Sequence, residues 1–405
     1  MHWRSAILIT FLFVFIAGSE AEGQPSNEDL KSIPQFELNG HVGRLVKIHG
    51  EYPPNDISSS VEFNLSYKLR GNKSWHRTYS SPSAGFSIIH SQFGNQDVLG
   101  QALAVIPAMR FEKWVNSTRW SWRAGLGFAA FNKPYNEFEN PRNLVIGSRV
   151  TNMSMIRLEM SKPLGQHMRY SLGFSFTHCS DGHIAVPNIG ANLIAITAGF
   201  SWSQSNALLM ASGFGKSKLS SHRRWQAGGS IITGLHEFNG TIRPVNGPRY
   251  LVMGENIFAT KELRENRFIS FGVNHHFYQA YLDYMITQEL FTSGENNKWK
   301  SHTLVIYGGY EWKYGKMSLF LQAGLNVYAP FLVAMNEVWD LPKHGWLYLH
   351  TANKIGYRYY PLSNSLINPF ISLGVKTNGG TADFVELAAG FSIHKKRELS
   401  APVAE

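Results

Sequence analysis

The polar side chains with the clearest chemical meaning lie between residues 178 and 192. Apolar side chains fall on the even positions from 170 to 176, so continuing this alternation places His178 and Ser180 on the apolar face of one strand. Asn192 has the parity of the apolar side chains in the returning segment 191–202. Residues two apart on a strand lie about 6.6 Å apart, close enough for a His–Ser hydrogen bond. An imidazole beside a hydroxyl can serve as a general base and a nucleophile.

A non-catalytic interpretation of the same residues is open at this point. Strand ends in membrane proteins contain polar side chains where the chain enters the headgroup region, so a single His or Ser would indicate nothing. A catalytic site requires geometry that parity alone does not supply.

The segments that must position these residues alternate with period two. Residues 61–69, 119–128, 317–327, 367–375 and 385–394 each place apolar side chains on one face and polar or small ones on the other. Many run to ten residues or more, the length that a tilted strand needs to cross a bilayer. The pattern predicts an all-β protein.

A transmembrane antiparallel β-barrel explains this pattern better than a soluble sandwich. The non-apolar faces are rich in Gly, Ser and Ala with isolated Arg and Glu, which suits a crowded barrel interior. Trp and Tyr lie near the segment ends, as interfacial girdles require. We predict one barrel over residues 58–394 with roughly 12 to 14 strands, in which Arg119, Arg123, Arg149 and Arg157 line the interior and pair with Glu. Tight turns are expected at 162–165, 313–316 and 377–380, and long loops of the opposite rim near 132–142, 214–222, 239–248, 290–300 and 330–345.

Composition excludes several other classes of protein. Only 16% of the 405 residues are charged and 13% are aromatic, which excludes a disordered chain. No run of 18 apolar residues occurs after the first 20 residues, which excludes a helical membrane protein. The single cysteine, Cys179, excludes an internal disulfide, and its parity predicts a small buried filler. His236 and the pair His275–His276 are expected at strand ends or in loops.

The N-terminus is typical of an export signal. Residues 1–4 carry a positive charge and residues 5–17 are almost wholly apolar. The small residues Ser19 and Ala21 stand at positions −3 and −1 of a cut after Ala21, which predicts a signal peptide over 1–21. Residues 22–57 show no clean alternation and are expected to form a periplasmic or plug-like lead, and 395–405 a polar tail. The net charge of +10 favours anionic partners, and export makes phosphorylated lipid a better partner than nucleic acid.

The motif around the histidine resembles a known family. His178-x-Ser180 followed by Pro187-Asn188-x-Gly190 is similar to the signature of the lipid A 3-O-deacylase (PagL, acyloxyacyl hydrolase-like) family, and Asn143–Ser148 resembles its longer members. The resemblance covers about residues 143–202. It implies an outer-membrane barrel of a Gram-negative bacterium that hydrolyses an ester-linked acyl chain of lipopolysaccharide, with Ser180 as nucleophile, His178 as base and Asn188 at the oxyanion.

Two positions depart from the pattern of the smaller family members. Asn192 replaces a Glu that orients the histidine, and Asp181 replaces an Asn after the serine. An amide can orient an imidazole but cannot stabilise imidazolium by charge. We therefore expect an outer-membrane lipid A esterase with a lipid-facing Ser–His site, no cofactor and no metal. The alternative is a non-catalytic barrel such as a porin, transporter or lipid-binding structural protein.

Overall fold

The computed structural model describes residues 33–69, 73–204, 225–237, 242, 245, 247–290, 297–339, 345–362 and 366–394. The predicted signal peptide (1–21), the predicted loop 214–222 and the predicted tail (395–405) lie outside the described residues.

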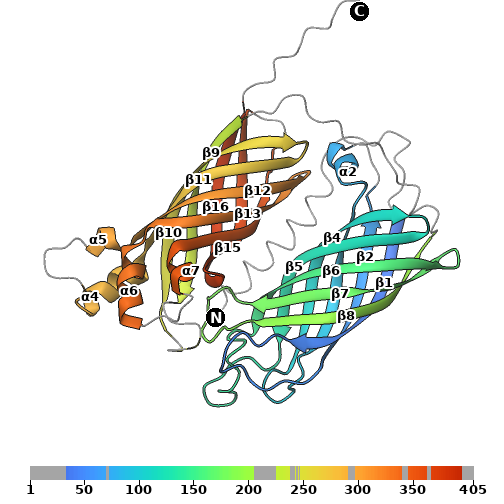
Figure 1. The fold of residues 1–405 in the computed structure, drawn as a ribbon, viewed down its shortest axis with the longest axis horizontal. Coiled ribbons are helices and arrows are strands. Elements are labelled where there is room, and N and C mark those ends of the chain that lie inside the picture. Colours follow the sequence, from blue (N-terminus) through green and yellow to red (C-terminus); the bar gives the residue numbers. More distant parts are fainter. Residues whose placement is uncertain are drawn as a thin grey trace, which may run out of the picture. The chain divides into compact units, whose positions relative to one another are not determined.

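The chain forms two closed antiparallel barrels of eight strands each (Figure 1). The first barrel consists of β1 (Ile33–Leu45), β2 (Ser58–Lys68), β3 (Ser83–Gln92), β4 (Gln101–Val115), β5 (Thr118–Phe131), β6 (Val150–Leu164), β7 (Met168–Ser180) and β8 (Ala191–Ser203). The second consists of β9 (Trp225–Glu237), β10 (Arg249–Arg264), β11 (Arg267–Tyr278), β12 (His302–Tyr314), β13 (Met317–Tyr328), β14 (Thr351–Tyr359), β15 (Ile367–Asn378) and β16 (Thr381–His394). Each barrel closes by pairing its first strand with its last, β1 with β8 and β9 with β16.

The predicted transmembrane antiparallel barrel class is confirmed, but the organisation differs from the prediction. Sixteen strands form two barrels, instead of roughly 12 to 14 strands in one barrel over 58–394. Residues 33–45, which we expected in a periplasmic or plug-like lead over 22–57, form β1 of the first barrel. Its alternation is easy to miss because the buried side chains, Gln35, Glu37, Asn39 and His41, are polar.

Many large apolar side chains of both barrels are exposed on the outer wall, and most of the ion-paired charged side chains of the strands are buried inside. On the first barrel Leu38, Phe174 and Ile196 are each more than half exposed. Arg157 in the interior is 0% exposed. This is the reverse of a soluble protein and fits a wall that faces lipid. No helix in the described ranges is long and apolar enough to cross a membrane.

The interior of the first barrel is a network of buried ion pairs. Arg157 contacts three carboxylates, at 2.9 Å from Glu37, 2.8 Å from Glu62 and 2.9 Å from Glu159. Arg123 contacts Glu62. Because a buried charge is costly without a partner, this mutual pairing stabilises the charged part of the interior. A separate apolar cluster that includes Ile106, Phe131 and Met153 is also buried in this barrel. The predicted interior placement of Arg119, Arg123 and Arg157 is confirmed, whereas Arg149 is exposed just before β6.

Connections of unequal length distinguish the two rims of the first barrel. One rim has the loops 46–57, 93–100, 132–149 and 181–190. The opposite rim has the turns 116–117 and 165–167 and the connection containing α2 (Ser74–Thr78). The predicted tight turn at 162–165 lies on this opposite rim, and the predicted loop at 132–142 on the long-loop rim.

The second barrel has helices at one rim. They are α4 (Gln279–Thr287), α5 (Asn297–Lys300), α6 (Pro330–Trp339) and α7 (Gly345–His350). Tyr281 of α4 stacks on Phe331 of α6 at 4.1 Å and on Tyr278 at 4.3 Å, and this apolar cluster closes the end of the barrel. The tight turn predicted at 377–380 exists, but it lies at the same rim as the helices, against α7, and not opposite the long loops.

Candidate active site

His178 and Asn192 face each other across the last two strands of the first barrel. They are direct partners in the register of β7 and β8. His178 Nδ1 lies 2.8 Å from Asn192 Oδ1, so Nδ1–H donates to the amide oxygen. This bond fixes the orientation of the ring and leaves the lone pair on Nε2, which is the arrangement that a general base needs.

Ser180, the last residue of β7, accepts two hydrogen bonds from the loop that follows it. The Asn188 side-chain amide donates to Ser180 Oγ at 2.9 Å, and the backbone N–H of Gly182 donates at 3.1 Å. The backbone N–H of Asp181 donates to Asn188 Oδ1 at 3.4 Å and completes a small ring of bonds. Two N–H donors beside a hydroxyl can also stabilise an oxyanion that forms next to it.

His178 and Ser180 lie on the same side of Gly190. A Cβ built on Gly190 would lie 3.2 Å from His178 Cε1 and 3.7 Å from Ser180 Cβ. The φ angle of Gly190 is +82°, a conformation that glycine adopts without strain. No hydrogen bond joins these two described side chains, and Ser180 Oγ accepts from Asn188 and Gly182. Ser180 O–H remains available as a donor.

The loop 132–149 supports the loop 181–190 from the side. Backbone N–H groups of Ile189 and Gly190 donate to the carbonyls of Leu144 and Val145 at 3.1 and 3.0 Å. The fully buried Asn143 caps this segment, with Oδ1 accepting from the N–H groups of Val145 and Ile146 at 3.1 Å each. The segment 143–148 thus acts as a frame for the residues around Asn188.

Asp181 is turned away from the histidine. Its carboxylate accepts from Ser148 Oγ at 2.5 Å and from the backbone N–H of His183 at 3.1 Å. Burial raises the pKa of the Asp181 carboxyl above its usual range, although these hydrogen bonds oppose that effect. It therefore serves to hold the loop and does not orient the imidazole.

His178 and Asn192 are half-buried on the outward face of the strands, whereas Ser180 and Asn188 are buried, at 8% and 5% exposed. Below the site on the same face Phe176 and Ile194 are 41% and 53% exposed. On the neighbouring strand β6, Ser154 pairs with His178 and Asn152 pairs with Ser180. Both are half-buried and have the outward parity, and they add polar groups beside the predicted pair.

The structure therefore brings together all four predicted site residues, Ser180, His178, Asn192 and Asn188. Sequence reasoning included Gly190 in the motif without giving it a role. It missed Gly182 and the Ser148–Asp181 contact, because a backbone donor and a contact between loops have no signature in residue type. The glycines themselves were the only available signal. Cys179 is fully buried, as predicted.

The three other histidines singled out in the sequence, His236, His275 and His276, lie in the second barrel. The His236 side chain lies 3.6 Å from the Asp383 carboxylate. His275 contacts Glu255 at 2.9 Å and His302 at 2.7 Å. Across the part of the chain that the structure describes, no group of three or more His, Cys, Asp or Glu side chains could hold a metal ion.

Comparison with known proteins finds a likeness for the first barrel. Residues 59–201, from β2 into β8, match the family model of lipid A 3-O-deacylase (PagL). The first barrel is PagL-like. Among solved structures, the outer membrane enzyme PagL is 16% identical with a TM-score of 0.31, covering 40% of this chain and 97% of that chain. OccAB4 from Acinetobacter baumannii is 10% identical with a TM-score of 0.21, covering 92% of this chain and 100% of that chain. No curated protein matches the chain.

The PagL-like match and the transmembrane barrel fold locate the protein in the outer membrane of a Gram-negative bacterium. The match ends within β8, so it does not extend to the second barrel.

Proposed function

We propose that this protein is an outer-membrane esterase that hydrolyses an ester-linked acyl chain of lipid A through Ser180 and His178. The observation that supports this most strongly is the set of hydrogen bonds that the two side chains make with neighbouring residues. Asn192 holds Nδ1 of His178, and Asn188 and Gly182 surround Ser180 Oγ with donors. The family match supports the substrate class.

The reaction begins when the hydroxyl of Ser180 turns toward His178 Nε2. Nε2 takes the proton while Oγ attacks the ester carbonyl carbon, and the carbonyl oxygen becomes an oxyanion. Asn188 Nδ2–H and the Gly182 N–H donate to Ser180 Oγ in the resting site. As Oγ bonds to the carbonyl carbon, the same two donors can turn to the neighbouring oxyanion.

Collapse of this intermediate breaks the bond to the sugar oxygen. The imidazolium Nε2–H gives its proton to the leaving sugar oxygen, which departs as a hydroxyl, and the acyl group remains on Ser180 Oγ. Water then attacks the acyl-enzyme with His178 as base, which releases the fatty acid and restores Ser180. Asn192 orients the ring throughout but supplies no charge to balance the imidazolium.

The lipid-facing position of the site suits an acyl substrate that never leaves the membrane. The exposed Phe176 and Ile194 would contact the hydrocarbon of the acyl chain. The loops around Asn188 lie at the strand ends, where the sugar and its ester groups are expected.

Mass spectrometry of lipid A from cells that express the protein tests the proposal. The wild type is expected to remove one acyl chain, and Ser180→Ala and His178→Ala are expected to leave lipid A intact. Ser117→Ala and His167→Ala, exposed residues at the opposite rim, serve as matched controls and should behave as the wild type.

Heat-modifiable migration on gels should be equal for all these variants, which separates loss of catalysis from loss of folding. If lipid A is unchanged by the folded wild type, the alternative of a non-catalytic barrel replaces the esterase. If lipid A is shortened equally by Ser180→Ala, deacylation occurs at another site.

A further inference from the structure

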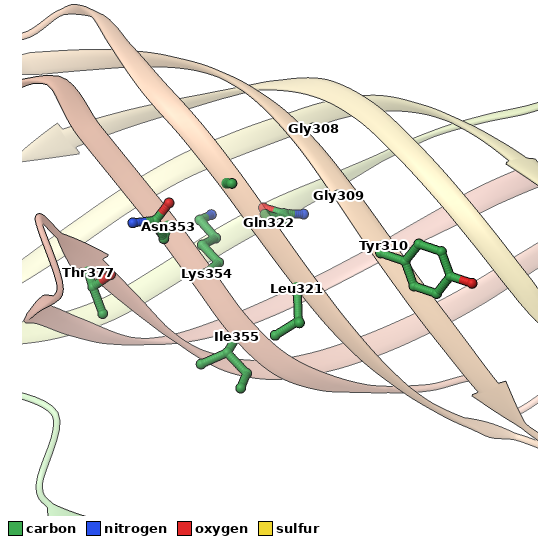
Figure 2. Close-up of a pocket in the computed structure, with 10 residues that line it drawn as sticks. Gly308, Gly309, Tyr310, Leu321, Gln322, Asn353, Lys354, Ile355 and Thr377 are labelled. Carbon is green, nitrogen blue, oxygen red and sulfur yellow. The ribbon is translucent and has the colours of Figure 1, made fainter.

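The outer wall of the second barrel contains a hollow of about 510 Å³ that crosses four neighbouring strands. Its centre is a row of cross-strand partners. Gly308 on β12 pairs with Ala323 on β13, Ala323 pairs with Asn353 on β14, and Asn353 pairs with Thr377 on β15. Figure 2 shows Leu321 and Ile355 on one side of this row. The hollow has the size of an ordinary small-molecule site.

Small residues create the hollow because they replace the large side chains that cover the wall elsewhere. A Cβ built on Gly308 would meet only the Phe271 ring, at 3.9 Å. Outward neighbours on the same strands are large, and Ile306 and Leu325 are 46% and 52% exposed. A membrane wall has hydrocarbon around it, so the space above Gly308 and Ala323 is accessible to an acyl chain.

The end of the hollow nearer the helical rim is polar. Asn353 is the third residue of β14 and Thr377 is the penultimate residue of β15, so both lie close to that rim. Both have outward parity and are half-buried, and neither side chain has a hydrogen-bond partner among the described residues. A polar group on a lipid-facing wall is costly unless something bonds to it.

We infer that this hollow is a lipid-binding site that holds one acyl chain of a membrane lipid by its ester end. The hydrocarbon lies over Gly308 and Ala323 between the side chains of Leu321 and Ile355. The Asn353 amide and the Thr377 hydroxyl donate hydrogen bonds to the ester carbonyl of the same chain. The site is non-catalytic, it lies in the second barrel, and it does not depend on Ser180 or His178.

Filling the hollow tests the inference. Full-length protein in mild detergent is incubated with dipalmitoyl phosphatidylglycerol, and native mass spectrometry counts the lipids that stay bound. Gly308→Leu should lose one retained lipid, because its side chain occupies the hollow without striking the backbone. Gly40→Leu is the matched control, since Gly40 is an outward glycine of the first barrel whose Cβ would meet only a carbonyl oxygen at 4.0 Å.

The polar end is tested separately by Asn353→Leu and Thr377→Val. Each removes one hydrogen bond and should reduce retention of the lipid about threefold to tenfold. Heat-modifiable migration checks that every variant is folded. Equal retention by Gly308→Leu and Gly40→Leu would overturn the inference. A wild-type dimer that Gly308→Leu alone converts to a monomer would also overturn it, because a second copy would then fill the hollow. Either result leaves the proposed esterase activity unaffected, because that activity is measured on lipid A.

Discussion

The two barrels differ in the connection between their seventh and eighth strands. In the first barrel β7 and β8 are joined by residues 181–190, which contain Asn188 and the backbone donor at Gly182. In the second barrel β15 and β16 are joined by Gly379 and Gly380 alone. A two-residue turn has no room for donors around a strand end. The length of one loop therefore separates a strand end with a candidate catalytic site from a strand end without one.

The interiors differ in a related way. The first barrel joins its buried charges into one network in which Glu62 contacts Arg123, Arg157 and His41. The second has separate pairs, Lys354–Glu386 at 2.5 Å and Arg358–Glu311 at 2.9 Å. It also packs Phe258, Phe320 and Phe370 around the Arg358 guanidinium. Charge pairing in the first barrel and aromatic packing in the second solve the same problem of filling a narrow interior.

The largest expected effect is on the rate of hydrolysis, at the end of β7 beside this connection. Ser180→Ala and His178→Ala should each reduce hydrolysis by about a thousandfold or more, and the double variant should be hardly slower, because members of one catalytic unit are not additive. Thr381→Ala, at the corresponding end of the second barrel, should leave the rate unchanged. Initial rates of fatty-acid release from lipid A measure this. Multiplicative losses in the double variant would contradict a shared step.

The contrast in charge pairing should appear in stability. Arg157→Met leaves three buried carboxylates without that partner and should cost about 3–5 kcal/mol in the free energy of unfolding. Arg358→Met leaves one carboxylate, which still accepts a bond from Tyr360, and should cost less. Denaturant midpoints in detergent compare the two variants. A larger loss for Arg358→Met would show that the aromatic packing matters more than the network.

The orienting role of Asn192 should affect rate without affecting folding. Asn192→Ala should slow hydrolysis by about a hundredfold, because a displaced imidazole no longer meets the hydroxyl in a productive geometry. Asn192→Glu should retain or raise the rate, since a carboxylate also stabilises imidazolium. If Asn192→Ala is as fast as the wild type, another group orients His178.

Two glycines of the compared connections make a matched pair. Gly190 and Gly380 have φ angles of +82° and +90°, so alanine at either position should cost about 1–2 kcal/mol of stability. Only at Gly190 would the added Cβ press on the His178 ring, whereas nothing lies within 4 Å at Gly380. Gly190→Ala should therefore lose about tenfold in rate and Gly380→Ala none. Equal rates in the two variants would show that the ring tolerates the contact.

The smallest expected effect concerns Asp181. Its raised pKa means that the folded protein favours the neutral acid, so the stability it contributes is greatest below the ordinary pKa of about 3.9 and is lost as pH rises through the raised value. Asp181→Asn should therefore stabilise the protein by about 1 kcal/mol or less at neutral pH and not at all below that range. The free energy of unfolding of the two proteins, measured at neutral pH and below the ordinary pKa, checks the sign of this difference. A gain found only at low pH would contradict it.

Local sequence determined the strands and the order of residues along the candidate site. Alternation through residues 168–180 places His178 and Ser180 on one face without any tertiary information, because side-chain direction on a strand follows position. The spacing to Asn192 needed only the turn between two neighbouring strands to bring it opposite His178. These contacts are local in sequence, which is why they could be predicted.

Tertiary structure alone decided how many barrels the strands form and what surrounds Ser180. Closure depends on pairs such as Gln35 with Ser203 and Val385 with Leu235, which are distant in sequence and leave no periodic signal. The donors at Ser180 likewise come from a loop backbone at Gly182 and from an Asn188 supported by residues 143–146. Side-chain alternation determines which face of each strand is buried, but only the inter-strand hydrogen bonds of the closed barrel determine which strands are neighbours.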